Sequence, residues 1–191
     1  MERNNAVDWN QRYQSNTVLP TACFSLQKYA YLLPKTGKAL DLACGLGGNA
    51  LFLAQRGLEC SAWDFSAQAI TQLQQVAQNL SLSLSTEVRD VVLNPPAANS
   101  FDVIVVSHFL ERDLALPLKN ALTKGGILIY QTFSREAVDL DSPPRNPAYR
   151  LAAGELLSLF SGLKVIIYHE EGNLGDSSQG FRNQALLIAQ A

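Results

Sequence analysis

The chain has 191 residues, of which 47% are hydrophobic and 17% are charged. This composition fits one folded domain covering residues 1–191 and excludes a disordered or fibrous chain. Because 15 Lys and Arg face 17 Asp and Glu, for a formal charge of −2, no general basic field attracts nucleic acid or anionic membranes.

The start of the chain, MERNNAVDWNQRYQ, lacks the apolar core and small-residue cleavage site of a secretory signal. Nothing later approaches the roughly 18 apolar residues of a membrane span. The three cysteines, Cys23, Cys44 and Cys60, form no CxxC pair, and only two histidines are present. We therefore expect a cytoplasmic protein without a metal site.

Two helices are predicted ahead of the first strand, at residues 5–15 and 22–33, and residues 1–36 are expected to form a helical cap. Its side chains most suited to contact a substrate are Trp9, Arg12 and Tyr13. An amphipathic helix that docks by its aromatic side is the alternative interpretation of Trp9 and Tyr13.

From Lys38 onward, short β-rich runs alternate with longer helical ones, which is typical of an α/β fold, a doubly wound sheet with helices on both faces. The predicted strands cover residues 38–42, 58–63, 82–88, 101–107, 126–133, 163–169 and 184–189. The predicted helices cover residues 48–56, 66–79, 110–123 and 153–160. Ser66 is expected to cap the second of these helices, and Gly125-Gly126 to end the third. Pro117 is expected either near the start of that third helix or at a break in an earlier turn. The last two strands leave no room for a crossover helix, so they are predicted to pair antiparallel at one edge.

Residues 45–50, GLGGNA, follow the first strand and match the GxGxxA spacing of a dinucleotide-binding turn. Asp41, four residues ahead of Gly45, argues against that ligand because a carboxylate repels a pyrophosphate. A carboxylate instead suits a cofactor that carries an ammonium and a sulfonium, as S-adenosylmethionine does. The alternatives are an NAD(P)-binding oxidoreductase and a tight turn that binds no ligand.

Two further acids end the next two predicted strands, at the carboxyl edge where open α/β sheets bind ligands. Asp64 is placed to accept hydrogen bonds from the hydroxyls of a ribose, with Phe65 beside it against the adenine. Asp90 follows the third strand and is placed to accept from the adenine amino group. Three acids in this order favour a nucleoside-containing cofactor.

The chain resembles the class I S-adenosylmethionine-dependent methyltransferases through DLACGLGG (41–48), Asp64, Asp90, FDVIVVS (101–107) and KGGILIY (124–130). The resemblance implies a Rossmann-like, seven-stranded sheet of order 3-2-1-4-5-7-6 with an antiparallel last strand. It also implies that Asp41 and the backbone from Ala43 to Gly47 hold the methionine part of the cofactor. It further implies that Asp90 and Val91 contact the adenine and that Ser107 lies below the sulfonium. Cys44 is interpreted as packing in this loop, beside Gly45.

More narrowly, DLACGLGGNALFLA, with WNQRY ahead of it, resembles the branch that contains tellurite-resistance and thiopurine methyltransferases. This implies methyl transfer by in-line displacement to a small acceptor, such as a thiol or a chalcogen oxyanion like tellurite, with S-adenosylhomocysteine as product. A methyltransferase-like domain that binds without turnover is a further alternative. From the composition and the lack of a long apolar stretch we expect no membrane partner, and the oligomeric state stays open.

Residues 37–133 are expected to form the cofactor-binding half and residues 134–191 the substrate side. His108, directly after the fourth strand, is the candidate general base, although a structural histidine is an equal alternative. Other candidate substrate contacts lie at the ends of the fourth and fifth strands: Arg112, Arg145 and Arg150 for an anion, and Tyr130, Thr132 and Phe133 for the acceptor pocket. Asn94-Pro95-Pro96 resembles a base-holding motif but precedes the fourth strand, so we interpret it as a turn and do not expect a nucleic acid substrate.

Overall fold

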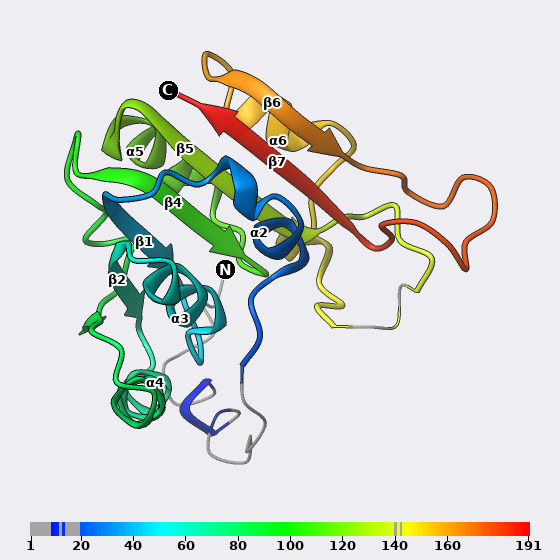
Figure 1. The fold of residues 1–191 in the computed structure, drawn as a ribbon. Helices are drawn as coiled ribbons and strands as arrows, with labels where there is room; N and C mark the ends of the chain where they lie inside the picture. Colours follow the sequence, from blue (N-terminus) through cyan, green and yellow to red (C-terminus); the bar gives the residue numbers. More distant parts are fainter. Residues whose placement is uncertain (1–8, 12, 14–19, 140, 142) are drawn as a thin grey trace.

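The computed structural model describes residues 9–11, 13, 20–139, 141 and 143–191 as an α/β structure built on one sheet (Figure 1). The seven strands lie in the order β3-β2-β1-β4-β5-β7-β6. Their bounds are β1 Lys38–Leu42, β2 Glu59–Asp64, β3 Ser85–Val88, β4 Phe101–Ser107, β5 Leu122–Phe133, β6 Lys164–His169 and β7 Gln184–Gln190. The predicted strand order is confirmed.

The first five strands pair in parallel, whereas β7 pairs antiparallel with both β5 and β6. The antiparallel edge that the sequence predicted is therefore confirmed. Parallel pairing brings the carboxyl ends of β1, β2 and β4 to one edge of the sheet. The amino end of β7 reaches the same edge, because Gln184 pairs with Phe133 at the end of β5.

Helices cover both faces of the sheet, as predicted. They are α2 Phe24–Lys28, η1 Ala30–Leu32, α3 Gly48–Gln55, α4 Ala67–Asn79, η2 Arg112–Leu114, α5 Ala115–Ala121, η3 Pro147–Tyr149 and α6 Glu155–Leu159. The buried side chains form two clusters, one containing residues of α2, α3 and α4 and the other containing residues of α5 and α6. Each cluster is the core between one face of the sheet and its helices.

Two helix predictions are corrected by the structure. The helix expected to end at Gly125-Gly126 ends at Ala121, and both glycines lie inside β5. Gly125 has a φ of +81°, and a Cβ on Gly126 would lie 2.9 Å from the carbonyl oxygen of Thr123, so the glycines serve an irregular stretch of strand rather than a helix end. The helix predicted at residues 22–33 is divided at Tyr29 into α2 and the 3₁₀ turn η1.

Several local signals were interpreted correctly. The Ser66 hydroxyl accepts a hydrogen bond from the backbone N–H of Ala69 at 3.2 Å, so it caps α4 as predicted. Pro117 is the third residue of α5, near its start.

Among the described residues, no helix has the length and apolarity needed to cross a membrane, and no three His, Cys, Asp or Glu side chains gather as a metal site would require.

Candidate functional site

The glycine loop between β1 and α3 lies at the carboxyl edge of the sheet. Gly47, the N-cap of α3, has a φ of +79°, and a Cβ there would lie 2.3 Å from Leu73 of α4. A Cβ on Gly48 would lie 2.3 Å from the carbonyl oxygen of Thr21. These glycines are therefore required both for the turn and for the close approach of neighbouring segments.

Asp41 is fully buried beneath this loop and is bound to the start of α3. Its carboxylate accepts hydrogen bonds from the backbone N–H of Ala50 at 3.0 Å and from Asn49 Nδ2 at 3.1 Å. Burial raises the pKa of Asp41 to about 7, against the opposing effect of these hydrogen bonds. The acid thus has a structural role that the sequence analysis did not foresee, and the choice of cofactor does not depend on it alone.

Asn49 is a residue of this site that the sequence analysis missed. Its Nδ2 donates to Asp41 and, at 2.9 Å, to Ser107 Oγ at the end of β4, while its Oδ1 accepts from the backbone N–H of Cys23 at 2.9 Å. The side chain therefore ties together β1, β4 and the segment before α2. The available signal was a polar residue in the first turn of a mostly apolar helix.

Asp64, the last residue of β2, joins the glycine loop to α4. Its two carboxylate oxygens accept hydrogen bonds from the backbone N–H groups of Gly45 at 2.8 Å and of Ser66 at 2.9 Å. The residue is only 6% exposed, and burial raises the pKa of its carboxyl group. The structure thus brings together the glycine loop and the acid that the sequence assigned to a ribose.

The described part of the N-terminal cap lies against the same loop. Asn10 Oδ1 accepts from Ser66 Oγ at 2.6 Å, and the carbonyl oxygen of Tyr13 accepts from Gln72 Nε2 at 2.9 Å. The Tyr13 hydroxyl lies 2.8 Å from the position that a Cβ on Gly45 would occupy.

Trp9 and Tyr13, two of the predicted substrate residues, stack on each other with ring centroids 5.8 Å apart. The third, Arg12, lies outside the described residues. The cap therefore contacts both the glycine loop and the start of α4.

The remaining predicted cofactor residues lie after β2 and β3. Phe65 is half-buried between Asp64 and Ser66. Asp90 Oδ1 accepts from the backbone N–H groups of Val92 and Leu93, so this acid shapes the turn after β3. Val91 is buried in one core cluster. Cys44, in the glycine loop, is also buried and packs in the other core cluster. Burial raises the pKa of the Cys44 thiol well above its usual value.

His108 follows β4 with a φ of +54°, an uncommon conformation for a residue with a side chain. Its backbone N–H donates to the carbonyl oxygen of Gln131 at 2.9 Å, and its ring lies 5.2 Å from that of Phe133. Burial lowers the pKa of His108, and the nearby side chain of Gln184 opposes this effect. Since the usual pKa of histidine is about 6.5, the imidazole is mainly neutral at neutral pH.

The arginines predicted to attract an anion are engaged with the protein itself. Arg112 binds Glu155 through Nε–Oε1 at 2.5 Å and Nη2–Oε2 at 3.1 Å, and it also donates to the carbonyl oxygens of Ala148 and Arg150. Arg150 is buried and donates to the carbonyl oxygen of Ser134, and Arg145 donates to that of Asp141. These contacts join the segments after β4 and β5.

Tyr130 and Thr132 are buried in the sheet. The Tyr130 hydroxyl donates to the carbonyl oxygen of Phe109 at 3.0 Å, and burial raises its pKa. Thr132 is 1% exposed, and its hydroxyl has no hydrogen-bond partner among the residues that the structure describes. Phe133, one residue further, is half-buried and is the member of this group that contacts His108.

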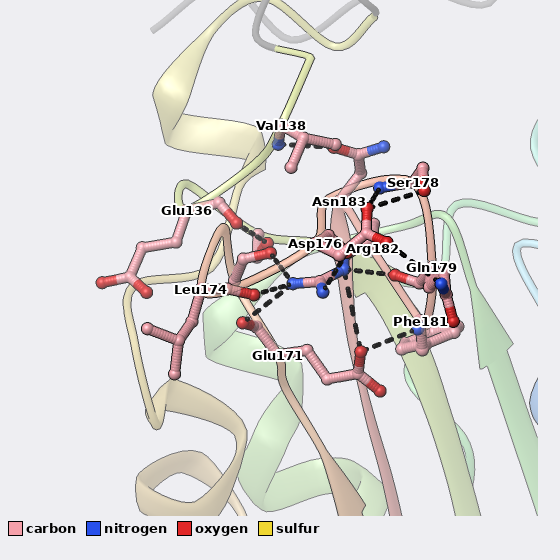
Figure 2. A network of polar contacts seen from close by, with 12 residues as sticks. Glu136, Val138, Glu171, Leu174, Asp176, Ser178, Gln179, Phe181, Arg182 and Asn183 are labelled. Carbon is pink, nitrogen blue, oxygen red and sulfur yellow. Dashed lines mark hydrogen bonds and ion pairs between the residues drawn. The ribbon is translucent and has the colours of Figure 1, made fainter.

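The segment between β6 and β7 folds around Arg182, a feature that the sequence analysis missed (Figure 2). The guanidinium donates to backbone carbonyl oxygens of residues 171, 172, 174, 176 and 179. Asn183 Oδ1 accepts from the backbone N–H of Val138 at 2.8 Å, which connects this segment to the one after β5. The two segments thus hold each other beside the start of β7.

A sheet of this order, with a glycine loop after β1 and an acid at the end of β2, has the class I S-adenosylmethionine-dependent methyltransferase fold. Solved structures agree. An S-adenosylmethionine-dependent methyltransferase from Mesorhizobium loti superposes with a TM-score of 0.70 at 17% identity, covering 89% of this chain and 99% of the other. TehB from Haemophilus influenzae superposes with a TM-score of 0.69 at 21% identity, covering 96% of this chain and 65% of the other.

A match to a family model shows to which family the chain belongs. The model described as tellurite resistance protein TehB matches residues 10–182, and the chain belongs to this family. A curated relative from Haemophilus influenzae, named as a probable S-adenosyl-L-methionine-dependent methyltransferase TehB, is 29% identical over 150 residues. The match covers 73% of this chain and 49% of the relative, so the chain spans about half the length of the curated relative.

Proposed function

We propose that the chain binds S-adenosylmethionine and transfers its methyl group to a small-molecule acceptor. The observation that carries the proposal is the glycine loop whose backbone is bound by Asp64, in a chain that belongs to the TehB family. The acceptor is a small nucleophile such as a thiol or a chalcogen oxyanion like tellurite.

The charges around the loop support this cofactor over a dinucleotide. Two carboxylates, Asp41 and Asp64, are buried at the loop, and the charge of Asp64 adds to the effect of burial in raising the pKa of Asp41. A pyrophosphate would bring further negative charge to this place, whereas a sulfonium and an ammonium bring positive charge. The electrostatics therefore favour a cationic cofactor.

The residues of the loop fit the parts of such a cofactor. The backbone from Ala43 to Gly47, above Asp41, would hold the methionine part, and Asp64 would accept from the ribose hydroxyls. We assign the adenine contacts to Phe65, Asp90 and Val91. The contact with the sulfonium is assigned to Ser107. When bound, the cofactor supplies the electrophilic methyl carbon.

The chain itself has to align the acceptor and receive a proton where the acceptor arrives protonated. The neutral imidazole of His108 is the candidate base, since it stands after β4 on the edge that carries the glycine loop. The segments after β5 and between β6 and β7 lie at the same edge and are proposed to shape the acceptor side.

Calorimetric titration tests the cofactor. The full chain is titrated with S-adenosylmethionine and, separately, with NADH, and we expect binding of the first only. Asp64→Ala is expected to weaken that binding, whereas the matched control Asp102→Ala leaves it unchanged, because Asp102 binds Lys38 and Thr123 at the opposite ends of the strands. Binding of NADH without binding of S-adenosylmethionine would refute the proposal.

Turnover is tested by measuring S-adenosylhomocysteine with a series of thiols and with tellurite. Product formed with any of these acceptors supports a methyltransferase of small molecules. Tight cofactor binding with no product across the series would instead favour a binding domain without turnover.

A further inference from the structure

Arg89, the residue after β3, connects the end of β2 with the turn that follows β3. Its guanidinium lies over the ring of Trp63, with Cζ 3.9 Å from the ring centroid. Its backbone N–H donates to the carbonyl oxygen of Asp64 at 2.8 Å. Because Trp63 directly precedes Asp64, both contacts hold Arg89 to the strand that ends in the acid assigned to the ribose.

The guanidinium of Arg89 also binds the turn, which comprises residues 90–95. Its Nε donates to the carbonyl oxygen of Asn94 at 2.8 Å, and its Nη2 donates to that of Pro95 at 3.1 Å. Two nitrogens of one planar group thus meet two successive carbonyl oxygens, a geometry that suits a guanidinium better than an ammonium. The same group stays over the ring of Trp63, where the ring electrons attract a cation.

The part of the turn that Arg89 binds is largely exposed. Val91 and Pro96, near the two ends of the turn, are buried, whereas Leu93 is 70% exposed and Asn94 is exposed as well. Packing in the core therefore holds the ends of the turn. The two hydrogen bonds from Arg89 hold the stretch between them.

The backbone of the turn fixes the carboxylate of Asp90. Asp90 Oδ1 accepts from the backbone N–H groups of Val92 at 2.9 Å and of Leu93 at 3.2 Å, and the carbonyl oxygen of Asp90 accepts from the N–H of Asn94 at 2.9 Å. The orientation of the carboxylate thus depends on where these N–H groups lie. Since Arg89 binds the carbonyl oxygen of Asn94, it acts on Asp90 through the backbone of one residue.

The remaining contact of Arg89 is an ion pair with Glu87. Nη1 lies 3.2 Å from Glu87 Oε2, and the Glu87 side chain is half exposed. An exposed ion pair of this kind contributes little. The influence of Arg89 on the turn therefore comes mainly from its position over Trp63 and from the two carbonyl oxygens.

We propose that Arg89 is a positioning residue that makes the site selective for adenine, because it holds the turn in the shape that directs Asp90 at the amino group of the base. This rests on the proposed function, which assigns the adenine to Asp90 and Val91. A carboxylate accepts a hydrogen bond from the amino group of adenine, whereas it repels the carbonyl oxygen that hypoxanthine carries at the same position.

Calorimetric titration of the full chain with two ligands tests this selectivity. S-adenosylhomocysteine carries the amino group, and S-inosylhomocysteine, its deaminated analogue, carries the carbonyl oxygen instead. We expect the native chain to bind the first more tightly by about tenfold to a hundredfold, the usual effect of a hydrogen bond to a charged group. Equal affinities in the native chain would overturn the proposal, because the turn would then not discriminate between the two bases.

Arg89→Gln is expected to weaken binding of S-adenosylhomocysteine and to reduce the preference for it by about tenfold. A role in folding alone would lower both affinities by the same factor and leave the preference unchanged. Arg89→Lys keeps a charge near Trp63 but lacks the planar group, so we expect it to lose most of the preference as well. The native preference in either variant would overturn the proposal.

Arg56→Gln is the matched control for these variants. The Arg56 guanidinium lies over the ring of Phe52, with Cζ 3.5 Å from the ring centroid, at the end of α3 that is remote from the glycine loop. The substitution therefore removes the same kind of contact with a ring away from the turn. Both affinities should keep their native values.

Amide hydrogen exchange without ligand distinguishes failure of this proposal from failure of the proposed function. The N–H groups of residues 92–94 donate to Asp90, and we expect them to exchange about tenfold faster in Arg89→Gln. The N–H of Phe160, at the end of α6, is the reference and should keep its native rate. Native rates in the turn would overturn the proposal. If the native chain binds neither S-adenosylmethionine nor S-adenosylhomocysteine, the proposed function is refuted, and the exchange rates then decide whether Arg89 holds the turn.

Discussion

Replacing Asp41 by Asn should change how the stability of this protein depends on pH. The folded chain holds a proton on Asp41 up to about pH 7, because burial raises its pKa, whereas the unfolded chain releases the proton near the ordinary value of 3.8. The folded state therefore binds more protons in this interval, and raising the pH through it lowers the free energy of unfolding. The amide of the Asp41→Asn variant has no proton to lose, so the variant would not show this decline.

The size of the effect follows from the interval. Each pH unit between 3.8 and about 7 costs the native chain about 1.4 kcal/mol, so the total is about 4 kcal/mol. Asp41 meets two donors, Asn49 Nδ2 and the backbone N–H of Ala50, with one oxygen each, whereas Asn has only one side-chain oxygen. The substitution therefore also lowers the stability by an amount that is independent of pH. The expected result is therefore a change of about 4 kcal/mol in the difference between variant and native chain, in favour of the variant as pH rises.

Urea unfolding followed by circular dichroism at several pH values between about 4 and about 8 measures this difference. Asp102→Asn is the control, because the backbone N–H of Lys38 and the hydroxyl of Thr123 lower the pKa of Asp102. The stability that Asp102 contributes is lost only as pH falls below the ordinary value of 3.8, so the difference between this variant and the native chain should stay constant over the measured interval. Parallel pH curves for the native chain and Asp41→Asn would refute the assignment of a raised pKa to Asp41.

Three further substitutions test separate contacts. Asn49→Ala removes three hydrogen bonds of a buried amide, and we expect the free energy of unfolding in urea to fall by about 2 to 4 kcal/mol. Arg112→Gln breaks the contact with Glu155, so Tm should fall while the KM of the acceptor stays unchanged. Gly47→Ala places a methyl group against Leu73 at a φ of +79°, so calorimetry should show weaker S-adenosylmethionine binding together with a loss of about 1 to 2 kcal/mol in stability.

Each of these results has a clear contrary outcome. Native stability in Asn49→Ala would mean that Asp41 and Ser107 find other donors. A raised KM for the acceptor in Arg112→Gln, with an unchanged Tm, would assign Arg112 to substrate binding rather than to the joint with Glu155. Native affinity and stability in Gly47→Ala would show that the loop does not need its left-handed residue.

Much of the fold was predictable because its signals are local. The ends of β1 and β4 coincide with the predicted ranges, since each is a short apolar run with clear boundaries. Ser66 caps α4 through a contact three residues away, which the sequence shows directly. The helix wrongly extended to Gly125-Gly126 failed for the opposite reason, because pairing of β5 with β4 outweighed the helical pattern.

The site was predictable only in part. The sequence by itself determined the glycine loop and the acids at the strand ends, because a parallel sheet brings those ends to one edge. Tertiary structure alone decided that Asp41 is bound to Asn49 and Ala50, and that Gln131 connects Ser25 to Gln184. These partners include pairs 53 and 106 residues apart in the chain. Their contact depends on the register between strands and on where α2 packs, and no local periodicity specifies either.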